Sequence, residues 1–184
     1  MDITREYLDI RMVRDNLDAI PDYGVPAGYS IRWHQPGDEQ LWRNIHLLAD
    51  KYTQATPDLF VREFGSNIAT LAERQCFLLD STDSPVGTAS AWFDDRNEQG
   101  PGRVHWVAIV PEEQGNGLAN TLLSIICRRL RKLGHRNAYL TTQTVRISAI
   151  NLYLKFGFIA AIDSERDIHI WKQLQKHLKY AVDV

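Results

Sequence analysis

The sequence has little cysteine, and its cysteines are not arranged for chemistry. Cys76 and Cys127 are the two cysteines among 184 residues. Neither stands at the spacing of a zinc motif or of a redox dithiol, which excludes both kinds of site. Cys127 falls inside an apolar stripe with helical spacing, so we expect both thiols to be reduced residues of the core. No metal site is predicted.

Long apolar runs are also missing, and neither sign of charge dominates. No segment approaches the roughly 20 apolar residues that a membrane helix requires. The N-terminal segment MDITREYLDIRMVRDN carries too many charges for a secretory signal peptide. The net charge of -2 argues against a protein that binds nucleic acid by bulk electrostatics. We therefore expect a cytoplasmic protein without a membrane or nucleic-acid partner.

Motifs of nucleophilic catalysis and of nucleotide binding are missing as well. No Cys-His or Ser-His-Asp set stands out, and no Gly-Lys-Ser or Gly-Lys-Thr marks a P-loop. The dinucleotide fingerprint G-x-G-x-x-G fails because Asn120 stands where its third glycine belongs. A dinucleotide-binding enzyme, which also needs a second βαβ unit, is therefore disfavoured.

The composition that remains suits one globular domain with a sizeable core, since 44% of the residues are hydrophobic and 24% are charged. Residues 1–28 are interpreted as an N-terminal arm and connector, and residues 29–184 as the domain. Within the arm, Met12–Val13 and Leu17–Ile20 are expected to form a short helical piece. It would pack on the domain or on a partner chain, and a homodimer through this arm stays open.

A strand, a glycine turn and a helix follow one another between Arg103 and Leu133. Residues 104–110 are rich in valine and other strand formers, and Pro111 removes the backbone donor that would extend the ladder. From Leu118 onward the apolar residues fall at helical spacing, and Gly134 is a suitable left-handed end to the helix. The segment is therefore expected to run from a buried strand into an amphipathic helix.

The turn between them is Gln114-Gly115-Asn116-Gly117. Two glycines let main-chain N–H groups turn toward one point at the start of a helix, where the positive helix end also favours phosphate. A tight turn without a ligand would show the same residues. Both interpretations are open from the turn alone.

Periodicity and turn residues predict the other elements. Strands are expected at 29–34, 75–80, 86–93, 137–144, 158–162 and 167–172, and helices at 41–53, at 57–71 with a bend near Gly65, and at 148–156. Asp38 is expected to cap a helix. Aromatic residues at helical spacing are expected in the core: Trp42, Tyr52, Phe60 and Phe64. The acidic pair Asp94-Asp95 either meets a cationic acceptor or belongs to a solvated loop.

Two blocks of sequence carry a family resemblance. The first is Gln114-x-x-Gly117-x-Ala119 after a strand that ends in Val110-Pro111, and the second is the segment AINLYLKFGF at residues 149–158. Together they resemble the acyl-CoA signature and the Ala-x-x-Leu-Tyr-x-x-x-Gly-Phe segment of the GCN5-related N-acetyltransferase (GNAT) family. The resemblance covers roughly residues 29–172. One departure is Arg146, which stands where the family usually has an asparagine that contacts the cofactor.

The resemblance implies an α/β GNAT acyl-CoA N-acyltransferase fold. Its mixed twisted sheet has about six or seven strands flanked by helices, and two splayed central parallel strands admit acetyl-CoA. The backbone of Ile109 and Val110 would then pair with the pantetheine amides. The pyrophosphate would lie on N–H groups of the turn and of the following helix, with Gln114 either contacting it or supporting the loop: Gly115, Asn116, Gly117, Leu118 and Ala119.

The implied reaction moves acetyl from acetyl-CoA to a primary amine of a small molecule or peptide by direct attack, which needs no protein nucleophile. Tyr153 matches the family tyrosine that gives a proton to the departing thiolate, and a strand-end N–H near Ile109 would stabilise the oxyanion. Many relatives place a glutamate on the central strand, but no acidic residue lies between Arg103 and Val110. His105 resembles the strand histidine of arylalkylamine acetyltransferases, so it is either the base or a structural histidine. An inactive acyl-CoA-binding or sensing domain of the same fold is the alternative.

Overall fold

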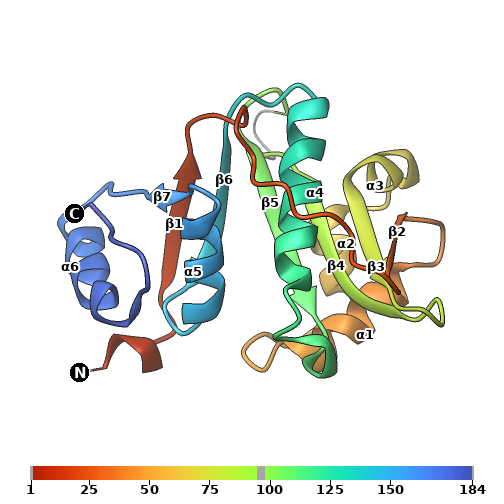
Figure 1. The fold of residues 1–184 in the computed structure, drawn as a ribbon, viewed down its shortest axis with the longest axis horizontal. Helices are drawn as coiled ribbons and strands as arrows, with labels where there is room; N and C mark the ends of the chain where they lie inside the picture. Colours follow the sequence, from red (N-terminus) through yellow and green to blue (C-terminus); the bar gives the residue numbers. More distant parts are fainter. Residues whose placement is uncertain (1, 95–97, 184) are drawn as a thin grey trace. The chain divides into compact units, whose positions relative to one another are not determined.

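The computed structural model describes residues 2–94 and 98–183 and contains both strands and helices (Figure 1). Within these residues seven strands form one mixed sheet in the order β2-β3-β4-β5-β6-β1-β7. The strands are β1 Asp9–Arg14, β2 Ser30–Trp33, β3 Gln75–Leu79, β4 Pro85–Trp92, β5 Gly102–Ile109, β6 Ala138–Gln143 and β7 Ile159–Ala160. The α-helices are α1 Glu39–Ala49, α2 Leu59–Phe64, α3 Ile68–Arg74, α4 Leu118–Lys132, α5 Ile147–Lys155 and α6 Glu165–Leu174. The predicted α/β class and mixed sheet are confirmed.

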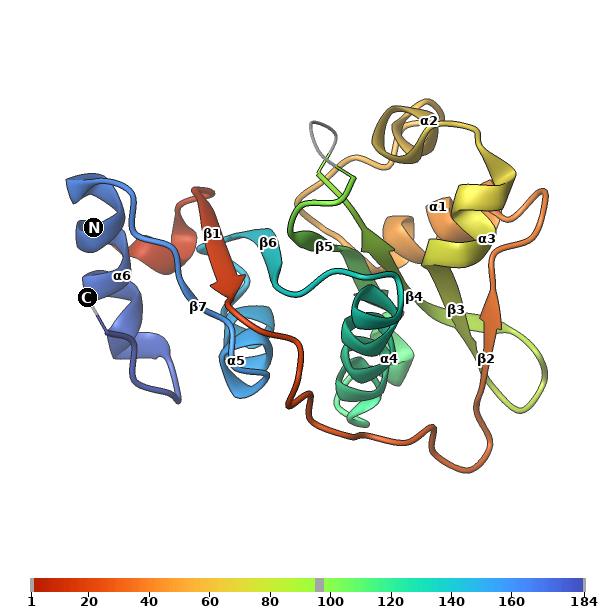
Figure 2. The ribbon, with the colours of Figure 1, turned by 90° about the horizontal axis from the view of Figure 1, so that it is seen from above.

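The chain divides into two units, of which the second comprises residues 22–92 and 104–129. Its strands β2, β3 and β4 pair in antiparallel fashion, and β3 is buried along its whole length. Figure 2 shows α1 and α4 on opposite sides of these strands. A Cβ atom on Gly87 of β4 would lie 2.5 Å from Ile109 Cδ1 and 3.3 Å from Leu122 Cδ1. The glycine therefore allows β5 and α4 to pack closely on β4.

The first unit comprises residues 1–21, 93–103 and 130–184. In it β6 runs antiparallel to β1, with Leu140 opposite Met12, and parallel to the start of β5, with Ala138 opposite Gly102. The parallel pairing that we predicted is confirmed, and it follows from the helix that connects the two strands. The ladder between β5 and β6 holds two register pairs among the described residues. The splaying of these strands stays a prediction.

The helical piece expected near residues 12–20 is wrong, because residues 9–14 form strand β1 between β6 and β7. Ile10, Met12 and Arg14 are buried, whereas Asp9 and Arg11 are exposed. This alternation with a period of two is the signature of a strand with one buried face. The segment expected as an arm thus contributes a strand to the sheet.

The terminal strand expected at 167–172 is also wrong, because these residues lie in helix α6. Ser164 caps the helix by accepting a hydrogen bond from the N–H of Asp167. The buried side chains of the helix, Ile170, Trp171 and Leu174, repeat at helical and not at strand spacing. The preceding expectation for residues 158–162 is met in part, since β7 covers Ile159–Ala160.

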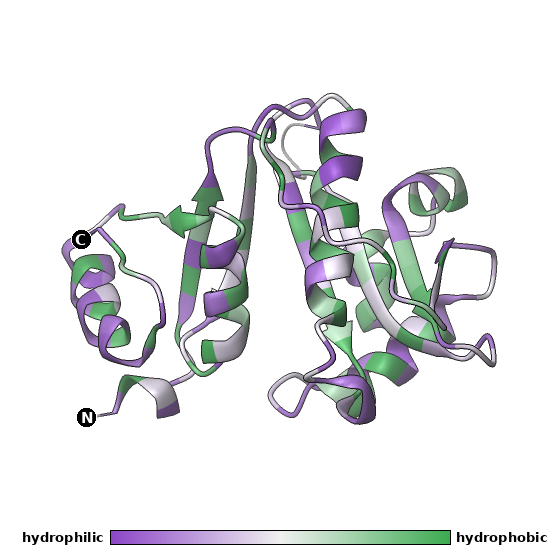
Figure 3. Ribbon diagram, in the orientation of Figure 1, coloured by the Kyte–Doolittle hydropathy of each residue, from purple (hydrophilic) through white to green (hydrophobic). Residues whose placement is uncertain are grey.

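Three of the four aromatic residues that we expected in the core are buried: Trp42, Phe60 and Phe64. Tyr52 is the exception at 42% exposure, because α1 ends at Ala49 and the stripe does not continue. Figure 3 shows α4 carrying both hydrophobic and hydrophilic residues, as the amphipathic pattern predicts.

Asp38 stands at the first position before α1, yet its side chain does not cap that helix. The carboxylate instead accepts hydrogen bonds from the Gln35 N–H at 2.7 Å and from the Arg32 guanidinium at 2.6 Å.

Of the acidic pair in the loop before β5, Asp95 lies outside the described residues. Asp94 accepts a hydrogen bond of 3.5 Å from the Tyr139 hydroxyl.

Across residues 2–94 and 98–183, no helix is both long enough and apolar enough to cross a membrane.

Candidate functional site

The glycine turn lies between a short 3-10 turn at Pro111–Glu113 and the start of α4. Gly115 and Gly117 have φ angles of 86° and 78°, a backbone region that side chains disfavour, so glycine is required at both positions. The carbonyl of Gly117 accepts hydrogen bonds from the N–H and the Nδ2 of Asn120, which close the first turn of the helix.

The N–H groups of this turn are placed for an anion. Gly115, Asn116 and Gly117 are exposed, and no hydrogen bond among the described residues uses their N–H groups. They precede α4, whose N-terminal end carries partial positive charge and further unpaired N–H donors. The turn therefore has the donors that a pyrophosphate requires.

Two side chains brace the turn from outside. The amide of Gln114 donates from Nε2 to the carbonyl of Ile109 at 2.9 Å, which ties the turn to the end of β5. The carboxylate of Glu113 accepts hydrogen bonds from the Tyr29 hydroxyl at 2.6 Å and from Asn116 Nδ2 at 3.3 Å. The hydrogen bond to Glu113 raises the pKa of Tyr29. Of the two roles that the sequence allowed Gln114, this geometry matches support of the loop.

Ile109 and Val110, the two residues predicted to pair with pantetheine, differ in the hydrogen bonds of their backbone groups. The N–H of Val110 donates to the carbonyl of Val86 at 2.9 Å, and its carbonyl accepts from the N–H of Glu113 at 3.0 Å. Neighbouring residues of a strand direct these groups to opposite sides, so those of Ile109 point away from β4. The Ile109 N–H is therefore better placed for a ligand than the backbone of Val110.

Strand β5 is irregular at Trp106, whose φ angle of 50° is rare for a bulky residue. In a regular strand His105 and Trp106 would point to opposite faces of the sheet. Here both reach one carboxylate oxygen, Oε2 of Glu63 on α2. His105 Nε2 lies 3.2 Å from this oxygen, at ion-pair distance, and the indole Nε1 of Trp106 donates to it at 2.9 Å.

Aromatic rings surround this contact. Phe64 meets His105 edge to face at 5.3 Å between ring centroids, and Trp42 meets Trp106 in the same way at 5.1 Å. The side chain of His105 is 6% exposed and that of Glu63 is 26% exposed. The imidazole is therefore enclosed, while the carboxylate has one side toward solvent.

Sequence reasoning found His105 but missed Glu63. The residue stands four positions after Leu59 and three after Phe60, both buried on α2, so it lies on the inward face of the helix. The sequence did contain one signal for Glu63, which is a carboxylate at an apolar position of an amphipathic pattern. A buried charge needs a partner, so such a position indicates a polar contact inside the protein. The sequence could not predict that the partners of Glu63 are His105 and Trp106, because this contact depends on how α2 packs against an irregular strand.

Tyr153 belongs to the first unit, on α5, and is 8% exposed. Its ring meets Phe158 edge to face, with 6.1 Å between the ring centroids. Nearby in the sequence, Arg146 donates from Nε to Gln143 Oε1 at 2.6 Å. Asn151 donates to the Ile147 carbonyl and accepts from the Lys179 N–H at 2.7 Å. Asn151 thus holds the C-terminal segment, and nothing in its contacts transfers the family asparagine's role to it.

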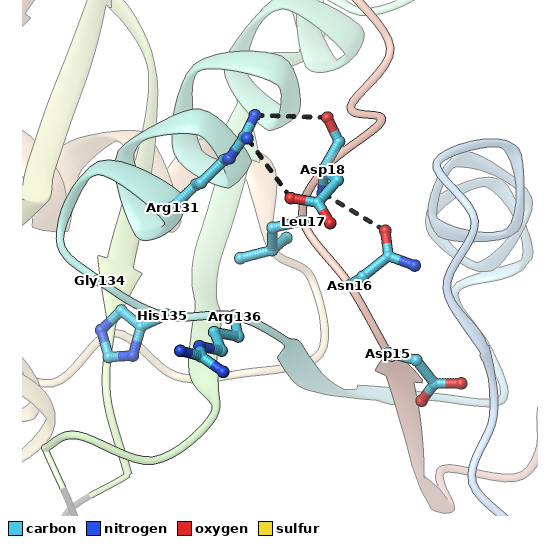
Figure 4. A pocket seen from close by; sticks show the side chains of 8 residues that line it. All are labelled: Asp15, Asn16, Leu17, Asp18, Arg131, Gly134, His135 and Arg136. Carbon is cyan, nitrogen blue, oxygen red and sulfur yellow. Dashed lines mark hydrogen bonds and ion pairs between the residues drawn. The ribbon is translucent and has the colours of Figure 1, made fainter.

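Two cavities of the first unit contain none of the predicted site residues. One, of about 490 Å³, is drawn in Figure 4, where the Arg131 side chain reaches Asp18. It is lined by Asp15, Asn16, Leu17, Asp18, Arg131, Gly134, His135 and Arg136. A second, of about 530 Å³, is lined by Asp2, Ile3, His169, Lys172, Gln173, Lys176 and His177. Charged side chains line both cavities.

Both cysteines lie in the core. The thiols of Cys76 and Cys127 are buried, and burial raises the pKa of Cys76 to about 12, which keeps it protonated. In the part of the chain that the structure describes, no group of three or more His, Cys, Asp or Glu side chains is arranged to hold a metal ion.

The chain is similar to curated enzymes that are longer than itself. The mycothiol acetyltransferase of Paenarthrobacter aurescens is 28% identical over 165 residues, which cover 84% of this chain and 50% of that protein. The mycothiol acetyltransferase of Thermobispora bispora is 30% identical over 159 residues, which cover 80% of this chain and 52% of that protein. The chain therefore spans about half the length of these relatives.

Solved structures show the same fold. A GCN5-related N-acetyltransferase from Sphaerobacter thermophilus superposes with a TM-score of 0.66 at 21% identity, over 84% of this chain and 50% of that one. The ribosomal-protein-S18-alanine N-acetyltransferase from Escherichia coli superposes with a TM-score of 0.60 at 19% identity, over 73% of this chain and 79% of that one. The sequence profile of the Acetyltransferase (GNAT) family matches residues 41–158, well over half of the chain. The chain belongs to the acetyltransferase (GNAT) family.

Proposed function

We propose that this chain is an N-acetyltransferase that moves acetyl from acetyl-CoA to a primary amine of a small molecule or peptide. The observation that carries the proposal is the glycine turn, whose exposed N–H groups at Gly115, Asn116 and Gly117 precede helix α4. Membership of the family and the names of the curated relatives support acetyl transfer. The acceptor is proposed only as a class, since the chain spans half the length of those relatives.

The donor would be held by main-chain groups. Its pyrophosphate would lie on the N–H groups from Gly115 to Ala119, including that of Leu118, while Gln114 keeps the turn against β5. The N–H of Ile109 would face the pantetheine arm or the thioester oxygen. Val110 would contribute less, because its N–H and carbonyl bond within the protein.

The acceptor amine attacks the thioester directly. An amine with a pKa near 10 is protonated at neutral pH, so it must first lose a proton to a base, for which we propose His105. The nitrogen lone pair then forms a bond to the thioester carbon, and a backbone N–H stabilises the resulting oxyanion. The carbon–sulfur bond breaks, and the Tyr153 hydroxyl donates a proton to the thiolate. The nitrogen then loses its second proton to solvent, from which Tyr153 regains its own, and a neutral amide remains.

The proposal is tested by steady-state release of free thiol from acetyl-CoA in the presence of a panel of amines. We expect release that depends on the amine, on acetyl-CoA and on the protein. Binding of acetyl-CoA in calorimetry without amine-dependent release would instead support the binding or sensing domain. The absence of acetyl-CoA binding would overturn the proposed function.

A further inference from the structure

Glu113 places a carboxylate at the edge of the proposed pyrophosphate site. It is the last residue of the 3-10 turn and stands two positions before Gly115, the first of the exposed turn residues with an N–H for the pyrophosphate. Its Oε2 atom lies 3.3 Å from Asn116 Nδ2, so the carboxylate reaches the turn itself. Carboxylates and phosphates bind the same N–H donors at the start of a helix. The side chain of Glu113 therefore has the chemistry to compete with the pyrophosphate for this turn.

Tyr29 holds this carboxylate from another part of the chain. The Tyr29 hydroxyl donates to Glu113 Oε2 at 2.6 Å, a short hydrogen bond of the charge-assisted kind. This hydrogen bond is the main cause that raises the pKa of Tyr29 above its ordinary value near 10, so the phenol stays a donor at neutral pH. The same oxygen accepts from Asn116 Nδ2, and the two donors together determine where it lies.

The backbone of Tyr29 is anchored to the sheet and not to the 3-10 turn. Tyr29 directly precedes β2, whose Ser30 pairs with Leu79 of β3. Its N–H donates to the carbonyl of Pro26 at 3.2 Å and closes a tight turn, in which Gly28 takes a φ angle of 85°. The phenol can therefore hold Glu113 from a position that the glycine turn does not determine.

We propose that Tyr29 is a positioning residue of the acetyl-CoA site: it keeps the Glu113 carboxylate from the N–H groups of residues 115–117 and so leaves these donors to the pyrophosphate. This inference rests on the proposed function and assigns to it a residue outside the two sequence blocks of the family. Without the hydroxyl, the carboxylate would lose a charge-assisted partner, and the turn N–H groups, which no hydrogen bond among the described residues uses, would offer replacements. A carboxylate bound there would occupy the donors and repel the diphosphate.

Gln114 supports the same turn in a different way. Its amide donates to the carbonyl of Ile109 at 2.9 Å and ties the turn to the end of β5. Loss of such a bond would loosen the turn, whereas loss of the Tyr29 hydroxyl would release a negative charge beside it. Only the second kind of damage should be corrected when the charge of Glu113 is removed as well.

The test measures the Kd of acetyl-CoA by calorimetry. Tyr29→Phe keeps the half-buried ring and removes the hydroxyl, so the variant should fold, which its Tm without ligand checks. Its Kd should rise on the order of tenfold, as for the loss of one hydrogen bond to a charged group. Addition of Glu113→Gln to Tyr29→Phe should return Kd to within about threefold of the wild type, because a neutral amide competes less for the N–H groups.

The matched control adds Glu112→Gln to Tyr29→Phe instead. Glu112 is the neighbouring exposed carboxylate, so this substitution changes the net charge by the same amount at nearly the same place. The Kd should then stay close to that of Tyr29→Phe alone.

Each other result overturns a stated part of the inference. An unchanged Kd in Tyr29→Phe would overturn the role of Tyr29. A raised Kd that Glu113→Gln increases further would show that the hydrogen bond only supports the turn, and an equal recovery with Glu112→Gln would show a general effect of charge; both contradict the proposal while acetyl-CoA binding by the wild type stands. A wild-type protein that does not bind acetyl-CoA would overturn the proposed function itself, and the role of Tyr29 with it.

Discussion

Single residues of this protein hold conformations and contacts that an ordinary core does not need. Trp106 keeps a φ angle of 50°, at a cost of about 1–3 kcal/mol for such a conformation. Its indole hydrogen bond to Glu63 and its contact with Trp42 oppose that cost. The residue therefore links a local strain to the one buried histidine that the proposed chemistry uses.

Tyr153 gives the sharpest test at this scale. Its side chain is almost buried against Phe158, so Tyr153→Phe should keep the fold and remove only the hydroxyl. Loss of a general acid should lower kcat on the order of 100-fold, while the affinity for acetyl-CoA stays close to that of the wild type. Thiol release and calorimetric titration measure the two quantities. Tyr180→Phe, at a tyrosine that is 41% exposed, is the matched control, and an unchanged kcat in Tyr153→Phe would remove the assignment.

At the residue scale, a motif located the glycine turn before α4. The roles that the resemblance implies for that turn and for Tyr153 stay predictions. The sequence was not informative about Glu63, because no local pattern shows that α2 brings a carboxylate to β5. The sequence also did not predict the two backbone hydrogen bonds that Val110 makes with Val86 and Glu113. One depends on how the strands pair and the other on the conformation of the turn.

At the scale of elements, the ion pair of Asp38 and Arg32 links the end of β2 to the start of α1. Burial alone would raise the pKa of Asp38, but the hydrogen bonds from Arg32 and from the Gln35 N–H, with the nearby positive charge, outweigh it and lower the pKa. A lowered folded-state pKa means stability that is present above the unfolded value of about 3.9 and is lost as pH falls through the folded value.

Asp38→Asn should therefore lower the free energy of unfolding by about 1–3 kcal/mol at pH 7. Arg32 would lose its charged partner, the nearly buried carboxylate of Asp38. The difference from the wild type should shrink below about pH 4, where the wild-type carboxyl also becomes protonated. Urea unfolding at several pH values, monitored by tryptophan fluorescence, measures this difference in the free energy of unfolding. Asp58→Asn is the control, since Asp58 stands at the same position before α2 but pairs with Arg62 on the surface. A difference that stays constant with pH would contradict the role of the charge.

Element types were predictable wherever one signal dominated. Helix α4 has a long apolar stripe and a glycine at φ 94° after its end, and it was placed to within a residue. Helix α6 was taken for a strand because its short apolar run fits either period, and the cap between Ser164 and Asp167 was the stronger signal. Strand β1 was missed because its partners, β6 and β7, lie far along the chain.

For the molecule as a whole, the sequence predicted the family's sheet and the parallel relation of β5 and β6, because a helical crossover fixes that relation. It did not predict that the chain divides into two units, each built from separate stretches of sequence. That division depends on which contacts form between segments that are distant in the sequence, and the composition does not predict those contacts.

Binding of acetyl-CoA should be visible in the stability of the whole chain. A ligand that binds only the folded state adds about 2.7 kcal/mol at a concentration of 100 times Kd, so Tm should rise on addition of acetyl-CoA. Gly117→Ala should lower Tm, because alanine at a φ angle of 78° is strained by about 1 kcal/mol or more, and should also reduce the rise.

Gly134→Ala separates these two effects. Gly134 has a φ angle of 94° and open space around the added Cβ atom, so its substitution carries a similar backbone cost. It stands after the end of α4, far along the helix from the turn, and should keep the full rise in Tm on acetyl-CoA. If both variants kept that rise, the N–H groups at Gly117 would not hold the ligand, because a turn distorted at its tightest point cannot present the same donors to a pyrophosphate.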